Sequence, residues 1–262
     1  MSQAKPDILY TLDGPVGTIT LNRPQARNAL TYAMYDEIGR ICAAPEAYGS
    51  PRVLVLTGAG DRAFASGTDF SELQDIRTAG DSIAYEARVE GILRAIETCP
   101  VPTIAAIAGS VTGGGAIIAC ACDLRIATED ARFGFPIART LGNCLSIRNV
   151  ARITRLLGPA RLRDLVFTAR LVGAEEGRQI GLYSDVVADH VALVERTRHI
   201  AETVAGHAPL TLRATKMALD RLASAGGDIP DSDIVQLCYL SEDFREGMAA
   251  FLEKRPPDWK GR

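Results

Sequence analysis

Residues 109–143 read GSVTGGGAIIACACDLRIATEDARFGFPIARTLGN, and this stretch decides the fold. Its three consecutive glycines, at positions 113–115, open an apolar run that predicts the start of a buried helix. The first N–H groups of a helix have no partner inside it and point outward at the positive end of the helix dipole. Because glycine has no Cβ, another molecule can approach these N–H groups closely. The pattern suits an oxyanion hole, in which N–H donors hold a carbonyl oxygen that gains negative charge.

The stretch resembles the enoyl-CoA hydratase/isomerase (crotonase) superfamily, and the resemblance extends along nearly the whole chain. VGTITLNRPQARNAL at 16–30 is similar to the strand and turn that open the family sequence, and AFASGTDFSEL at 63–73 to its first oxyanion-hole segment. CDLRIATEDARFGFP at 122–136 follows the triple glycine as it does in the family, and SEDFREGMAAFLEKRPPDW at 241–259 matches the C-terminal helix. Four matches in the right order are far more specific than one glycine motif.

Hydrophobic periodicity predicts an α/β fold with mostly parallel strands. Alternating side chains at 8–12 and 16–21, on either side of Asp13-Gly14-Pro15, are typical of a β-hairpin. Apolar runs at 53–56, 103–107 and 124–127 predict buried strands, and 183–187 a short extended segment. The predicted helices span residues 32–44, 82–99, 146–157, 159–169, 174–180, 190–206, 210–225 and 232–254. Repeated alternation of strand and helix favours a parallel sheet.

The resemblance implies a more specific architecture, the crotonase-like (ClpP/crotonase) spiral of ββα turns. It assigns residues 1–200 to the spiral core and residues 201–262 to a C-terminal helical trimerisation region, the two forming one functional unit. It also implies that the protein assembles as a homotrimer or as a dimer of trimers.

The chain departs from the family at two positions that carry chemistry. Hydratases of the family have one glutamate two residues after the triple glycine and another directly after the FGxP proline, and here these positions hold Ile117 and Ile137. Adding water across a conjugated C=C bond needs a base for the water and an acid for Cα, and paired carboxylates serve both needs. Isoleucine can do neither, and the second glutamate, which suffices for the family's isomerases, is also absent. We therefore expect ordinary hydratase activity to be weak.

The resemblance identifies the backbone N–H groups of Thr68 and Gly114 as the oxyanion donors. The family often has alanine at position 68, so the Thr68 hydroxyl either narrows the hole or adds a donor. Asp69 is expected to cap the helix that begins at Phe70 or Ser71.

The substrate-binding residues follow from the same resemblance. Arg27 can bind a phosphate of coenzyme A bidentately, with a solvated loop arginine as the alternative. Phe251 and Lys254 match an aromatic residue and a lysine that reach the nucleotide end of coenzyme A, with a charged helix end as the alternative. The full set is Ala26, Arg27, Ser66, Thr68, Phe70, Gly114, Ile117, Ile137, Phe251 and Lys254.

Other polar residues could replace the missing carboxylates. Cys144 could be a nucleophile if a helix N-terminus lowered its thiol pKa, but no histidine is near in sequence to serve as its base. Asn143 is interpreted as the N-cap of a helix starting near Cys144. Glu86 and Glu90 are further candidates, although a solvated helix face explains both more simply.

The sequence leaves two function classes open. One is an enzyme that acts on an acyl-CoA thioester through enolate stabilisation. In the superfamily, hydration, isomerisation, decarboxylation and thioester hydrolysis all use the same oxyanion hole. The other is a non-catalytic acyl-CoA-binding protein. A peptidase is set aside because no Ser–His–Asp set falls on matched positions.

Composition restricts the partners and the compartment. The net charge of -3 and the lack of a basic cluster argue against nucleic-acid binding, and no apolar run is long enough for a membrane span. The six cysteines are scattered, which favours reduced, buried thiols, and the three histidines lie too far downstream to complete a metal site. We expect a cytoplasmic protein with no cofactor other than coenzyme A as part of its substrate.

Overall fold

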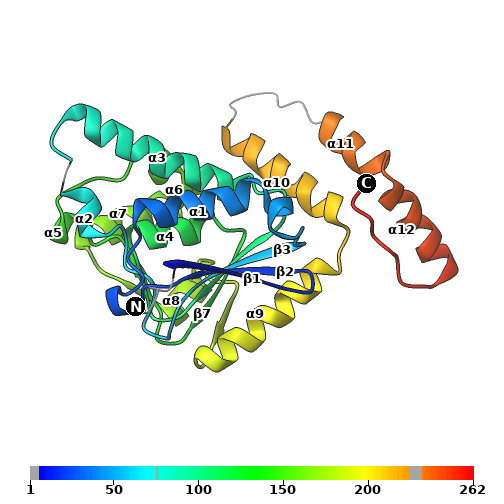
Figure 1. Ribbon diagram of the computed structural model, residues 1–262, viewed down its shortest axis with the longest axis horizontal. Coiled ribbons are helices and arrows are strands. Elements are labelled where there is room, and N and C mark those ends of the chain that lie inside the picture. The colour runs from blue at the N-terminus through cyan, green and yellow to red at the C-terminus, as the bar shows by residue number, and fades with distance from the viewer. Residues whose placement is uncertain (1–5, 75, 225–231) are drawn as a thin grey trace, which may run out of the picture.

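The computed structural model describes residues 6–74, 76–224 and 232–262 and contains two β-sheets (Figure 1). The larger sheet has the strand order β1-β2-β3-β5-β7-β10. Its strands are β1 (Ile8–Asp13), β2 (Val16–Leu21), β3 (Val53–Gly58), β5 (Thr103–Ile107), β7 (Leu124–Thr128) and β10 (Asp185–Val187). β1 and β2 form the expected antiparallel hairpin, and every later neighbour in this sheet pairs in parallel.

Both faces of the larger sheet are covered by helices, as the alternation of side chains in β3 shows. Leu54 and Leu56 belong to the main core with helices α1 and α3, whereas Val53 and Val55 pack with residues of α9 on the other face. Figure 1 shows α1, α3, α4 and α6 on one side of this sheet and α9 on the other. Such burial on both faces is typical of parallel sheets and explains the uninterrupted apolar sequence of β3.

The helices connect the strands and fill the C-terminal part of the chain. Two short 3₁₀ helices lie at Pro24–Ala26 and Pro45–Tyr48. The α-helices are α1 (Tyr32–Ala43), α2 (Phe70–Leu73), α3 (Ala79–Glu97), α4 (Gly113–Ala121), α5 (Ile137–Thr140), α6 (Ile147–Leu157), α7 (Pro159–Thr168), α8 (Ala174–Gln179), α9 (His190–Ala205), α10 (Pro209–Ser224), α11 (Ser232–Tyr239) and α12 (Glu242–Glu253).

The smaller sheet consists of β4 (Ala63–Ala65), β6 (Ser110–Thr112), β8 (Arg132–Gly134) and β9 (Val172–Gly173), in that order. β4, β6 and β8 run parallel to one another, and β9 is antiparallel to β8. The hydrophobic pattern of the sequence does not predict this sheet. Its strands have only two or three residues each, too few to produce an alternating pattern.

Two helix predictions need correction. The helix expected at 82–99 begins at residue 79, because Thr78 and Asp81 form a capping box that starts it earlier. The single helix expected at 232–254 is two helices, α11 and α12. The Ser241 side chain accepts a hydrogen bond from the N–H of Phe244 and so starts α12 as a separate helix. The predicted boundary at residue 200 falls inside α9, and the division into core and trimerisation region remains a prediction.

The C-terminal helices extend away from the rest of the molecule. Figure 1 shows α11 and α12 at the end opposite to α2 and α5. Large apolar side chains are exposed along them, namely Tyr239, Leu240, Phe244, Met248, Phe251 and Leu252. Within the described residues, no helix is both long enough and apolar enough to span a membrane.

Candidate active site

The smaller sheet brings together three segments that lie far apart in the sequence. β4 leads directly to Ser66-Gly67-Thr68, β6 leads into the glycines at the start of α4, and β8 leads through Pro136 to Ile137. Because β4, β6 and β8 are parallel neighbours, these three segments leave the sheet at the same edge. The carboxyl edge of a parallel sheet is where binding sites form in α/β proteins, and a cavity lies here.

Two backbone N–H groups, those of Thr68 and Gly114, lie side by side at this edge. Leu30 donates its N–H to the carbonyl of Gly67 and accepts the N–H of Asp69, each at 2.8 Å, so the N–H of Thr68 between them points to the other side. Gly114 is the second residue of α4, where a helix leaves the N–H without an internal partner. A Cβ built on Gly114 would lie 3.5 Å from the Thr68 nitrogen.

A row of three hydroxyl groups flanks these donors. The Thr68 hydroxyl lies 3.0 Å from the hydroxyl of Tyr35 on α1 and 2.8 Å from that of Tyr85 on α3. The three hydroxyl groups have three protons in total, and the two hydrogen bonds between them use two of these protons. One O–H group is therefore left to donate a hydrogen bond to another acceptor. Burial raises the pKa of both phenols, which therefore stay protonated near neutral pH. The Thr68 hydroxyl thus forms hydrogen bonds with two neutral phenols. All three hydroxyl groups lie near the sheet edge that carries the two backbone N–H groups.

The cavity has two connected parts, which we call the chamber and the groove. The chamber, about 110 Å³, is lined by residues that include Thr68, Gly114, Ile117 and Ile137. The groove, about 1170 Å³, is open to solvent and is lined in part by Phe70, Ile83 and Ile147. Six residues line both parts: Leu73, Tyr85, Glu86, Leu141, Asn143 and Cys144. Ile117 and Ile137 are each 7% exposed, so both form an apolar wall of the chamber.

Glu86 lies where the chamber meets the groove. The interpretation of its side chain as part of a solvated helix face is wrong, because Glu86 is half-buried and faces the cavity. Burial raises the pKa of its carboxyl, a hydrogen bond from Ser146 lowers it, and the negative charge of Glu90 raises it further. The net effect is a raised pKa, and burial is its largest cause.

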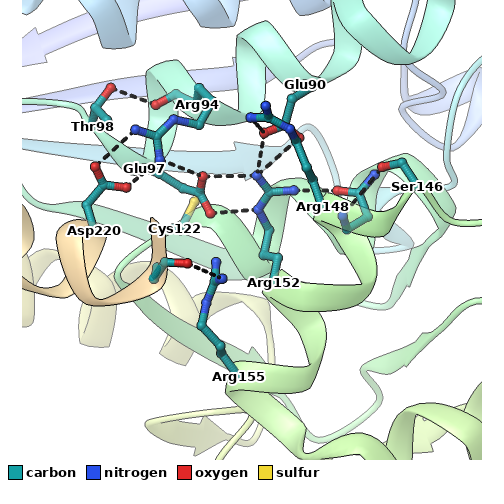
Figure 2. A network of polar contacts seen from close by, with 12 residues as sticks. Glu90, Arg94, Glu97, Thr98, Cys122, Ser146, Arg148, Arg152, Arg155 and Asp220 are labelled. Atoms are coloured by element: carbon teal, nitrogen blue, oxygen red, sulfur yellow. Dashed lines mark hydrogen bonds and ion pairs between the residues drawn. The ribbon is translucent and has the colours of Figure 1, made fainter. Parts of the chain in front are cut away.

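Glu90, one turn further along α3, has a different role from the solvated one expected. It forms ion pairs with Arg152 at 3.4 Å and Arg148 at 3.5 Å, both on α6. Arg152 also binds Glu97 through two nitrogens, at 2.7 and 2.9 Å, and Arg94 pairs with Asp220 on α10 (Figure 2). The network fixes α3, which carries Tyr85 and Glu86, against α6, whose N-cap is Ser146.

Arg152 is the centre of this network and is almost fully buried. Burial opposes its positive charge, but the hydrogen bonds and charges of Glu97 and Glu90 outweigh burial, so the pKa of Arg152 is raised. Its guanidinium also donates to the side chain of Asn149, which lines the chamber. The charge network therefore reaches the chamber wall.

The loop before α2 is held by a second set of polar contacts. Asp69 accepts from the N–H of Ser71 and so caps α2, which confirms the expected role of Asp69. Its other oxygen pairs with Arg23 at 2.6 Å, and this pairing, with the bonds from Ser71, lowers the Asp69 pKa to about 2. Ser66 donates its N–H to the carbonyl of Arg27 at 3.1 Å, which brings the 26–27 turn beside the chamber.

Comparison of the whole chain with known proteins identifies its family. The family model described as enoyl-CoA hydratase/isomerase matches residues 12–262. The chain belongs to the enoyl-CoA hydratase/isomerase family. It is 34% identical over 257 residues to the short-chain-enoyl-CoA hydratase of Clostridium acetobutylicum, covering 95% of each chain. It is 33% identical over 257 residues to the crotonyl-CoA hydratase of Syntrophomonas wolfei, covering 95% of this chain and 96% of that protein.

The solved structures give the same result for the fold. An enoyl-CoA hydratase/carnithine racemase from Magnetospirillum magneticum superposes with a TM-score of 0.91 at 31% identity, covering 99% of this chain and 97% of that one. The expected crotonase fold, with two sheets and C-terminal helices, is thereby confirmed.

Several candidate residues do not lie where the sequence suggested. Phe251 and Lys254 line neither the chamber nor the groove, and α12, which carries Phe251, lies at the far end of the molecule (Figure 1). Asn143 is not an N-cap, because α6 begins at Ile147 and its cap is Ser146. Cys144 precedes that helix in an exposed loop, so the expectation of a buried thiol is wrong for this cysteine.

Tyr35 and Tyr85 could not be recognised as site residues from the sequence. Both occur in helical patterns where an aromatic residue is normally part of the core, and Tyr35 is indeed fully buried. Their convergence on Thr68 depends on how α1 and α3 pack, which local patterns do not show. As for metals, the described part of the chain contains no cluster of three or more His, Cys, Asp or Glu side chains that could hold an ion.

Proposed function

We propose that this family member binds an acyl-CoA thioester and stabilises its enolate at an oxyanion hole formed by the N–H groups of Thr68 and Gly114. The observation that carries the proposal is the pair of adjacent N–H groups at the chamber wall, neither used by the regular pairing around it. Two hydrogen bonds to the thioester oxygen stabilise the negative charge that develops on it. Losing one such donor typically raises the free energy of the transition state by on the order of 3 kcal/mol. The named activities of the relatives support acyl-CoA as the substrate class.

Ordinary hydration of an unsubstituted enoyl-CoA is expected to be weak. We infer this from Ile117 and Ile137, which occupy the positions that carry the glutamates in typical family hydratases. An aliphatic wall cannot activate water or deliver a proton, and each positioned acid or base typically contributes about 10²–10⁴-fold. The chain would then act on the acyl group by a reaction that uses the oxyanion hole but not that pair. Isomerisation and decarboxylation would pass through an enolate, and thioester hydrolysis would pass through a tetrahedral oxyanion.

The coenzyme A part of the substrate would bind along the segments next to the chamber, at residues 26–27, Ser66 and Phe70. Ser66, with the 26–27 turn that its N–H contacts, and the exposed Phe70 at the groove support this path. Phe251 and Lys254 lie too far from these segments to serve the same chain's site. If they contact coenzyme A, they do so from a neighbouring subunit of the proposed trimer or dimer of trimers.

The experiment combines binding with turnover. Calorimetric titration with butyryl-CoA is expected to show binding, and a spectrophotometric assay with crotonyl-CoA is expected to give a kcat below the usual enzyme range of roughly 1–10³ s⁻¹. A kcat inside that range would mean that other groups replace the glutamates fully. Absence of butyryl-CoA binding would reject the acyl-CoA assignment.

A non-catalytic acyl-CoA-binding protein is the alternative that the apolar wall of Ile117 and Ile137 favours. It predicts butyryl-CoA binding with no chemical change at any carbon of the acyl group. The enolate proposal differs, because an enolate exchanges hydrogen with water at the carbon next to the thioester.

A further inference from the structure

Glu86 is the one carboxyl group that lines the chamber, within the part of the chain that the structure describes. It comes from α3, whereas the two isoleucines that form the apolar wall lie in the middle of α4 and at the start of α5. A carboxyl group therefore reaches the same chamber from a different element of the fold.

The surroundings of Glu86 are built to hold it there. Its neighbour Tyr85 is fixed by the 2.8 Å hydrogen bond to Thr68, whose N–H is one of the two oxyanion donors. Ser146 donates to the Glu86 carboxylate while its oxygen caps α6, accepting from the N–H of Asn149. The ion pairs of Glu90 and Glu97 with Arg152 hold α3 and α6 together beside it. Glu86 thus lies on one of two helices that are anchored to each other, and it lines the same chamber as Thr68 and Gly114.

The other polar groups of the chamber are poorly suited to accept a proton. The hydroxyls of Tyr35, Thr68 and Tyr85 are joined in a row, and burial keeps the two phenols protonated. Asn143 and Asn149 carry amides, which do not titrate near neutral pH. Cys144 lies in an exposed loop, two residues before Ser146, the N-cap of α6.

We propose that Glu86 is the catalytic carboxylate of this site and exchanges a proton with the acyl carbon next to the thioester carbonyl, an inference that rests on the proposed function. The Glu86 carboxylate forms an O–H bond as the C–H bond breaks. The electron pair of that bond becomes the enolate C=C bond, and the carbonyl π pair moves to the oxygen held by Thr68 and Gly114. Return of the proton to the same carbon restores the substrate, and its return two carbons further along an enoyl chain moves the double bond.

The test measures hydrogen exchange in D₂O. Wild-type protein is incubated with butyryl-CoA, and deuterium incorporation at the carbon next to the thioester is followed by proton NMR and mass spectrometry. Glu86→Gln is expected to bind butyryl-CoA as wild-type does but to lose exchange by at least about 100-fold. Glu37→Gln is the matched control: Glu37 lies on α1, pairs with Arg40 and Tyr48, lines neither cavity part, and should leave exchange unchanged.

Two further variants keep the inference falsifiable. Should Glu86→Gln fail to fold, Glu86→Asp shortens the side chain by one methylene and is expected to slow exchange strongly while preserving binding. Cys144→Ala removes the thiol that lines the same chamber and so tests the competing candidate for the proton transfer.

The outcomes separate this inference from the proposed function. Exchange by Glu86→Gln at the wild-type rate, or loss of exchange in Cys144→Ala with retention in Glu86→Gln, would overturn the role of Glu86 and leave the enolate proposal intact. Wild-type protein that binds butyryl-CoA without exchanging would overturn both the role of Glu86 and the enolate chemistry, and would favour the non-catalytic binder.

Discussion

Gly114 has to be glycine because of a side chain on another helix. A Cβ at this position would overlap the hydroxyl oxygen of Tyr35, while the nearest atoms of Thr68 would remain at 3.3 and 3.5 Å. Gly114→Ala is therefore expected to destabilise the protein by about 1–3 kcal/mol, the usual cost of overpacking. Urea denaturation measures this loss.

The same collision predicts a rescue. Tyr35→Phe removes the overlapping oxygen, so Tyr35→Phe/Gly114→Ala is expected to lose less stability than the sum of the two single changes. Purely additive losses in the double variant would show that the Tyr35 hydroxyl does not restrict position 114.

Asp69 provides a prediction about pH. Arg23 lowers its pKa to about 2, so the folded state binds this proton less readily than the unfolded state. The resulting stability is present above the unfolded pKa, near 4, and is lost as the pH falls through about 2. Asp69→Asn keeps a good helix cap but removes the charge, and is expected to cost about 1 kcal/mol at neutral pH. The difference from wild-type in urea denaturation should vanish near pH 2, and a difference that persists there would contradict the ion-pair explanation.

At the scale of single residues, the sequence predicted what depends on backbone and local pattern. Thr68 and Gly114 could be proposed as site residues because glycine turns and a helix start can be recognised locally. The cap at Asp69 could be predicted because it lies next to its helix. The side chains that meet Thr68, those of Tyr35 and Tyr85, come from α1 and α3. Glu86 faces the chamber because α3 packs against α1 and α4, a tertiary arrangement that helical periodicity does not encode.

One buried cation links helix α3 to helix α6. Arg152 on α6 lies between Glu90 and Glu97 of α3 (Figure 2), and its loss would leave two mostly buried carboxylates without their main partner. Arg152→Met is expected to cost about 3–5 kcal/mol in urea denaturation. Adding Glu90→Gln and Glu97→Gln should recover part of this loss, because no unpaired charge would remain. A loss below about 1 kcal/mol in Arg152→Met would show that packing alone fixes α3.

The elements that the sequence predicted are those with enough residues to show a period. The hairpin, the buried strand β3 and helix α1 each extend over six residues or more. The smaller sheet escaped prediction because β4, β6 and β8 are three residues long and are defined by pairing between distant segments. That sheet aligns the segments of the candidate active site, so the sequence indicated candidate residues but not the sheet that brings them together.

A single chain leaves an apolar surface exposed to solvent near its C-terminus. On α12 and just before it, Leu240, Phe244, Met248 and Leu252 are exposed, and α12 extends away from the core. We expect a homotrimer or a dimer of trimers, with this surface at subunit contacts. Light scattering at micromolar concentration should give three or six times the 28.0 kDa of the chain. Met248→Glu/Leu252→Glu is expected to dissociate the assembly, and a wild-type monomer would contradict the prediction.

The central claim is that the N–H groups of Thr68 and Gly114 bind the thioester oxygen. The stretching frequency of the bound thioester carbonyl tests this claim most directly. Isotope-edited infrared spectroscopy can follow butyryl-CoA labelled with ¹³C at its carbonyl, free and bound to the protein. Two hydrogen bonds from Thr68 and Gly114 would draw electrons toward the oxygen and weaken the C=O bond, so the account predicts a carbonyl band at lower frequency in the complex than in water. A bound carbonyl band at or above its frequency in water would contradict it.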